Sequence, residues 1–146
     1  MQLGTLRNGF KIIVMISVTN GKNDKVEEIL REYSALPEYS EMPIPTVNKK
    51  SLFGDYPINI ASTRGLTEEI SVLLDNGADI NAKGEHGYTP LHDAVEQGHM
   101  DAVKFLVSRG ANITIKNADG DTPIELAKLL DETEIYRFLD NLSASL

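Results

Sequence analysis

The sequence contains no cysteine. This absence excludes disulfide bridges, thiolate zinc sites and cysteine nucleophiles. The most apolar run, "FKIIVMISV" from Phe10 to Val18, is too short to span a bilayer, which takes about 20 residues. It also lacks the small-residue cleavage site that is typical of a signal peptide. We therefore expect a cytoplasmic protein that does not bind a membrane.

Basic residues are scarce relative to acidic ones. The chain carries 14 Lys and Arg against 22 Asp and Glu, a net charge of −8. Binding to nucleic-acid phosphates needs a basic face, so we expect no nucleic-acid partner. The charge suits a basic protein partner, because complementary charge speeds encounter. The alternative is that the charge only keeps the protein in solution.

Motifs of catalysis and metal binding are also missing. The sequence contains no G-x-x-x-x-G-K-[ST], G-x-S-x-G or H-E-x-x-H pattern. Neighbouring carboxylates such as Glu68 and Glu69 diverge on a helix instead of facing each other. The three histidines would have to converge with a carboxylate to bind a metal; they are His86, His92 and His99. We expect neither an enzyme nor a cofactor nor a metal site.

A proline-centred segment recurs with a period of about 33 residues. It reads "GDYPINIASTRG" from Gly54, "GYTPLHDAVEQG" from Gly87 and "GDTPIELAKLLD" from Gly120. A repeat at one fixed period indicates a repeat architecture. In this register three prolines and three alanines coincide: Pro57, Pro90, Pro123, Ala61, Ala94 and Ala127.

Each residue type in the repeat has a physical role. The proline suits the first turn of a helix, and Thr89 or Thr122 before it can cap that helix. A glycine such as Gly98 ends the first helix with positive φ. The alanine marks a tight contact between helices. Apolar residues at helical spacing then predict a second helix, for example Ile70, Leu73 and Leu74.

The middle repeat, with T-P-L-H-x-A from Thr89 to Ala94, closely resembles the ankyrin repeat, whose period is about 33 residues. The first repeat departs from that signature with "DYPINIA", and the third has Asp131 where the others have the helix-joining glycine. Such degeneracy is typical of end repeats, which face solvent on one side. The resemblance implies an all-α solenoid of about four helix pairs with short β-hairpin loops. It also implies that His92 is a scaffold residue.

The expected organisation is an N-terminal region followed by three repeats. Residues 1–50 form a degenerate capping repeat plus an insertion, and the repeats occupy 51–83, 84–116 and 117–146. "GKNDKVEEIL" (Gly21–Leu30) overlays the second helix of the middle repeat, which makes Phe10–Val18 the first helix of the N-terminal pair. The alternative is a strand, because this stretch is rich in β-branched residues.

Residues 1–9 are expected to be a poorly ordered start. The insertion after the N-terminal pair contains Pro37, Pro43 and Pro45. These prolines forbid a continuous helix, so we expect an extended loop.

The ankyrin resemblance implies that a partner binds the hairpin tips and the exposed face of each first helix. Phe53 and Tyr88 are aromatic anchor candidates, although Phe53 could instead pack under the insertion. Asp93 and Glu96, three apart on one helix, are expected to face a groove together. The expected partner-binding residues are Leu52, Phe53, Asp55, Thr63, Arg64, Glu85, His86, Tyr88, Asp93, Glu96, Gln97, Ala118, Asp119 and Asp121.

The resemblance implies a protein-binding module, which we expect to be monomeric. A small binder of this kind can act by blocking its partner, as do ankyrin proteins that serve as immunity partners of bacterial toxins or as kinase inhibitors. An acidic concave face suits a toxin that attacks nucleic acid, because such toxins are basic. The alternative is an adaptor that joins two proteins without inhibiting either.

Overall fold

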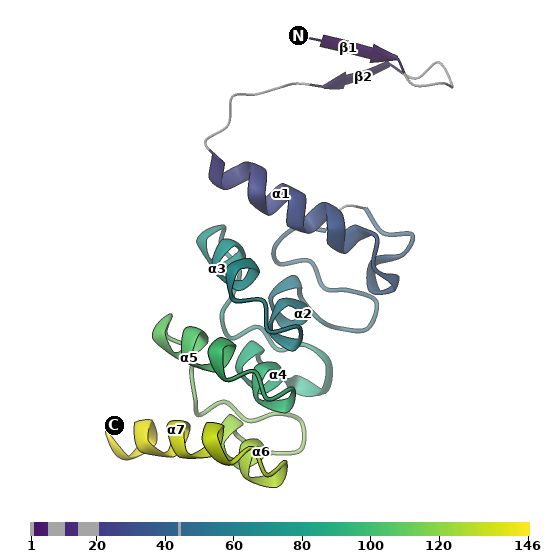
Figure 1. Ribbon diagram of the computed structural model, residues 1–146. Helices are drawn as coiled ribbons and strands as arrows, with labels where there is room; N and C mark the ends of the chain where they lie inside the picture. The colour runs from purple at the N-terminus through teal and green to yellow at the C-terminus, as the bar shows by residue number, and fades with distance from the viewer. Residues whose placement is uncertain (1, 6–10, 15–20, 44) are drawn as a thin grey trace.

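The computed structural model describes residues 2–5, 11–14, 21–43 and 45–146. Within these ranges, helices stack one after another along the chain (Figure 1). None of the helices in these ranges is both long enough and apolar enough to cross a membrane. In chain order the elements are β1 (Gln2–Thr5), β2 (Lys11–Val14), α1 (Gly21–Ser34), the 3-10 turn η1 (Pro37–Tyr39), α2 (Pro57–Thr63), α3 (Thr67–Asp75), the 3-10 turn η2 (Glu85–Gly87), α4 (Pro90–Glu96), α5 (Met100–Ser108), α6 (Pro123–Leu129) and α7 (Thr133–Ala144).

Three helix pairs repeat at the predicted spacing, and local capping explains where they begin. The Thr89 hydroxyl accepts a hydrogen bond from the backbone N–H of His92, and the Thr122 hydroxyl accepts one from Glu125. Gly98 ends α4 at φ +68°, as predicted. Asp131 occupies the same place after α6 at φ +58°, a conformation that glycine adopts with less strain.

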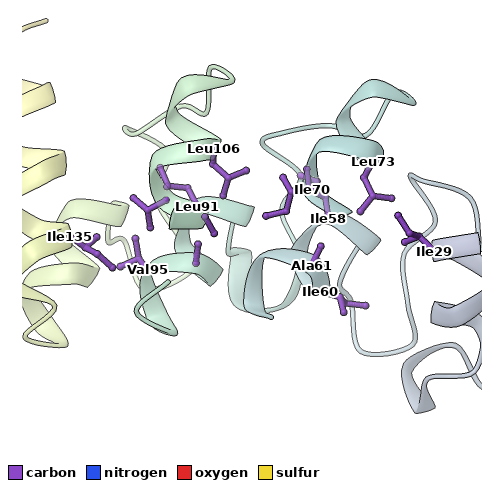
Figure 2. Close-up of a cluster of buried hydrophobic side chains, with 14 of the residues drawn as sticks. Ile29, Ile58, Ile60, Ala61, Ile70, Leu73, Leu91, Val95, Leu106 and Ile135 are labelled. Atoms are coloured by element: carbon purple, nitrogen blue, oxygen red, sulfur yellow. The ribbon is translucent and has the colours of Figure 1, made fainter. Parts of the chain in front are cut away.

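The pairs form two layers. The first helices α2, α4 and α6 pack side by side, and the second helices α3, α5 and α7 pack behind them (Figure 1). Apolar side chains from both layers meet in one continuous core (Figure 2). The repeating alanines are completely buried there, so the tight helix contact predicted for them is confirmed. The all-α solenoid predicted from the sequence is likewise confirmed.

The loops between pairs are hairpin turns. Each contains a backbone N–H···O bond between a residue and the fourth residue after it. No strand forms between residues 45 and 146. The three bonds run from Ser51 to Asp55 (2.7 Å), from Gly84 to Tyr88 (2.8 Å) and from Asn117 to Asp121 (2.9 Å). The turns therefore repeat with the same period as the helices.

The N-terminal pair differs from the prediction. Lys11–Val14 is the strand β2, which pairs antiparallel with Gln2–Thr5. The prediction of a helix is wrong over these four residues, and the strand alternative describes them. The expectation of a poorly ordered start is also wrong for Gln2–Thr5. β-branched residues favour extended backbone, which accounts for β2. Phe10 and residues 15–18 of the run, like residues 1 and 6–9 of the start, lie outside the described residues.

The proline-rich insertion is more than a loop on the surface. It contains no α-helix in its described part, as predicted, but Tyr39 of η1 is completely buried. The Tyr39 hydroxyl donates to the carbonyl of Lys49 at 3.1 Å. The backbone N–H of Leu52 donates to the carbonyl of Glu38 at 2.8 Å. The insertion thus joins the core next to the first repeat.

Candidate functional site

A cleft of about 240 Å³ opens where the tips of two hairpin turns meet the first helices. Its residues come from the turn before α2, the end of α2, η2, the link between η2 and α4, and α4 itself. All of them are among the predicted partner-binding residues: Asp55, Thr63, Glu85, His86, Tyr88, Asp93 and Glu96. The repeat period brings them together, because it places equivalent positions on adjacent helices.

Tyr88 forms one wall of this acidic cleft. Its ring stacks on His92 with the centroids 5.4 Å apart, and His86 meets its edge at 6.1 Å. Its hydroxyl donates to Glu96 Oε1 at 3.3 Å. Burial, and secondarily the Glu96 carboxylate, raises the pKa of Tyr88 to about 12. Tyr88 therefore stays a protonated donor at neutral pH.

The two tips beside the cleft are tied to each other. Asp55 Oδ1 accepts a hydrogen bond from the backbone N–H of Glu85 at 2.8 Å. Burial raises the pKa of the Asp55 carboxyl, although the hydrogen bond from Glu85 opposes that shift. A side chain at Gly84 would place its Cβ 2.2 Å from Asp55 Oδ1, so the Asp55 side chain would have to move away from Glu85 to admit it. The exposed carboxylate of Glu85 lies 3.6 Å from His86 Nε2.

Asp93 lies at the floor of the acidic cleft and is only 6% exposed. Its Oδ2 accepts a hydrogen bond from Asn59 Nδ2 at 2.9 Å. Burial raises the pKa of the Asp93 carboxyl well above its ordinary value, although the bond from Asn59 lowers it. Asp93 and Glu96, which were expected to face a groove together, both line this cleft, and the Asn59 amide holds the Asp93 carboxylate at its buried floor. Glu96 is exposed.

Leu52 and Phe53 form the exposed tip of the first hairpin turn, at 60% and 56% exposure. The alternative in which Phe53 packs under the insertion is therefore wrong. Arg64 is exposed, but its guanidinium lies 5.7 Å above the ring of Tyr33 on α1. None of these three predicted binding residues lines the cleft.

The other four predicted binding residues also lie outside the cleft lining. Gln97 is exposed beside Glu96, and Ala118 and Asp119 are exposed at the third tip. Asp121 is partly buried, and its carbonyl lies 3.0 Å from His92 Nε2. That contact joins the second repeat to the third, which confirms His92 as a scaffold residue.

Two features of the surface and the core were not predicted from the sequence. Leu129 and Leu130 end α6 and are 66% and 44% exposed. They occupy in the third repeat the positions of Glu96 and Gln97 in the second, so the repeat offset could have found them. Asn59 occupies in the first repeat the position of His92 and has the same role, because its Nδ2 donates to the carbonyl of Tyr88 at 3.2 Å.

No group of three or more metal-ligating side chains suited to a metal ion occurs among the described residues. A family model of ankyrin repeats in three copies matches residues 13–117. The chain belongs to the ankyrin-repeat family. Ankyrin repeats are protein–protein interaction modules, so this ankyrin-repeat protein binds other proteins. No similar sequence was found among curated proteins.

The match to the ankyrin family ends inside the third hairpin turn, before α6 and α7. The last helix pair nevertheless keeps the ankyrin geometry, with its capping threonine and buried alanine at the expected offset. The division of this ankyrin protein at 51–83, 84–116 and 117–146 stays a prediction.

Proposed function

We propose that this ankyrin-repeat protein acts as a cytoplasmic monomer that binds a basic partner protein on its concave face and inhibits it. The observation that supports this function is the composition of the acidic cleft. Four carboxylates line it, and none of its seven lining residues is lysine or arginine. The carboxylates belong to Asp55, Glu85, Asp93 and Glu96.

The cleft offers a lysine or arginine of the partner both negative charge and an aromatic contact. The exposed carboxylates of Glu85 and Glu96 stand at its rim, where they attract lysine and arginine. Tyr88 offers a ring held in place by His92, and a fixed aromatic is a favoured anchor. The net charge of −8 adds attraction over a longer range.

Inhibition is proposed by analogy with small ankyrin proteins that block toxins or kinases. A partner whose own ligand is an anion, such as a nucleic acid, would need its basic surface for that ligand. Occupation of that surface by the acidic cleft would then exclude the ligand. An inhibitor of the immunity type would act in this way.

The second candidate is an adaptor, which needs a second contact surface. A groove of about 600 Å³ lies away from the acidic cleft, beside α5 and the end of α7. Its lining is largely apolar and includes Val107, Ile113, Leu142 and Leu146. A second protein in this groove would allow two partners to be held together.

The test is an affinity purification from native cells, with a salt titration and an activity assay of what is bound. Glu85→Lys combined with Glu96→Lys reverses charge at the rim, while Glu134→Lys combined with Asp140→Lys makes the same change on α7. We expect the first variant to lose a basic partner and the second to retain it. Asp93 is left unchanged because it supports the fold.

Three results would count against the inhibitor. Equal retention by both charge variants would show that the acidic cleft is not the interface. A bound partner that stays active would exclude inhibition. Two partners held together at high salt would favour the adaptor.

A further inference from the structure

Two exposed apolar pairs flank the acidic cleft. Five large apolar side chains stand out as exposed in the described ranges, and four of them belong to these pairs. One pair, Leu52 and Phe53, forms the tip of the first hairpin turn. The other pair, Leu129 and Leu130, ends α6. Single exposed leucines are common on protein surfaces, whereas adjacent exposed pairs on one face suggest a contact surface.

The repeat geometry places the pairs at opposite corners of the face. The Asp55–Glu85 hydrogen bond ties the first tip to the second. The backbone N–H of Leu52 donates to Glu38 in the insertion after α1, so the first tip lies between that insertion and the second tip. α4 and α6 pack side by side (Figure 1), and Leu129 occupies on α6 the position that Glu96 occupies on α4. The acidic cleft therefore lies between the two apolar pairs.

The distance between the two apolar pairs sets the minimum length of a partner segment that contacts both. Neighbouring helices pack about 8–10 Å apart, and the two pairs belong to repeats two steps apart along the stack. A segment that reaches both must span about 20 Å. An extended chain covers this with about six residues and a helix with about thirteen.

We propose that this face recognises a single segment of the partner protein that has a lysine or arginine in its middle and an apolar residue on each side. This inference rests on the proposed function and adds the sequence pattern of the partner. Charge complementarity with Glu85 and Glu96 selects the central cation. Leu129 and Phe53 select the flanking residues, since a uniformly basic segment leaves both apolar pairs exposed to water.

The experiment selects a phage-displayed library of random 16-residue peptides on the full-length chain and sequences the bound pool. We expect enrichment of Lys or Arg with an apolar residue on both sides, at a spacing that reports an extended or helical segment. An enriched peptide, made synthetically, should bind the unaltered chain at least about tenfold more tightly than the double variant Phe53→Ser, Leu129→Ser.

Matched variants separate the two contributions. Selection on Phe53→Ser, Leu129→Ser should keep the central cation and lose the apolar flanks. Selection on Glu85→Gln, Glu96→Gln should lose the cation. Leu146→Ser is the control, because Leu146 is 91% exposed but lines the groove beside α5 and α7. Selection on this variant should give the same pool as the unaltered chain. Thermal unfolding of each variant confirms that the fold is intact.

Two outcomes would overturn the inference, and they differ in what they say about the proposed function. A pool rich in basic residues without apolar flanks would leave the acidic cleft as the binding site and exclude the flanking pattern. A pool without any preference for basic residues would exclude both.

Discussion

The side-chain amide of Asn59 donates a hydrogen bond to Asp93 Oδ2 at 2.9 Å, which joins α2 to α4 inside the stack. The same amide nitrogen lies 3.2 Å from the carbonyls of Ala82 and Tyr88. Asn59 is completely buried, and Asp93 nearly so. This contact connects the core to the floor of the acidic cleft, so the stability of the fold and the shape of the cleft depend on the same pair.

Asp93→Asn should change how stability depends on pH. Burial raises the pKa of Asp93 in the folded protein above its unfolded value of 3.8, so the folded state retains the proton more strongly. Its contribution to stability is therefore largest at low pH and falls as pH rises from about 4 through the folded pKa. Asparagine keeps an acceptor for Asn59 but does not ionise. We expect the variant to gain stability relative to the unaltered protein between pH 4 and pH 7, as measured by urea unfolding.

The difference between these two proteins isolates Asp93. The pKa of Asp55 is also raised by burial, but Asp55 is present in both proteins, so only its charge interaction with Asp93 differs between them. Parallel stability profiles across this pH range would contradict an ionisable Asp93 with a raised pKa.

Asn59→Ala should destabilise the protein by about 1–3 kcal/mol at pH 7. The change leaves buried acceptors on Ala82 and Asp93 without their donor. An unpaired buried polar group destabilises the folded state, because its desolvation is not compensated. In a double-mutant cycle with Asp93→Ala, which removes the acceptor, we expect a coupling energy of about 0.5–3 kcal/mol. Strict additivity of the two free-energy changes would mean that the hydrogen bond contributes nothing.

Ala94→Leu should destabilise the protein by about 1–3 kcal/mol through overpacking, because Ala94 is completely buried between first helices. The matched control is Ala144→Leu, which makes the same change at an exposed position at the end of α7. Thermal unfolding should show a lower melting temperature for the first variant only. An unchanged melting temperature for Ala94→Leu would contradict the tight contact at this position.

Tyr39→Ala should destabilise the protein by about 3–5 kcal/mol, since it removes a completely buried aromatic side chain. Tyr39→Phe keeps the ring and removes only the hydrogen bond to Lys49, so we expect a loss of about 1 kcal/mol. Urea unfolding of the two variants measures both values. If the alanine variant were as stable as the phenylalanine variant, the insertion would be a surface loop and not part of the core.

Much of the fold follows from short-range interactions that can be recognised in the sequence. Thr89 and Thr122 cap their helices through hydrogen bonds to residues three positions later, which depend only on local order. Gly98 ends its helix because it tolerates positive φ. Repetition at one fixed period then forces equivalent helices to stack, so the position of the acidic cleft could be predicted as well.

Two features depend on contacts that the local sequence pattern does not display. Asp93 and Glu96 share a helix and line one groove, as expected, but Asp93 lies at its buried floor because Asn59 on another helix supplies a donor. Lys11–Val14 forms a strand in the place where a helix was predicted, and its pairing partner is Gln2–Thr5. In each case the deciding contact lies outside the local pattern.

By itself, the sequence determined the period, the caps and the buried alanines, because these depend on backbone conformation and side-chain size within a single repeat. Only the tertiary structure decided which carboxylates stay exposed and that apolar pairs flank the acidic cleft. Exposure depends on what a neighbouring repeat presents to the side chain. Asn59 holds one carboxylate at the buried floor, whereas the Glu85 carboxylate lies 3.6 Å from His86 of its own turn and stays exposed at the rim.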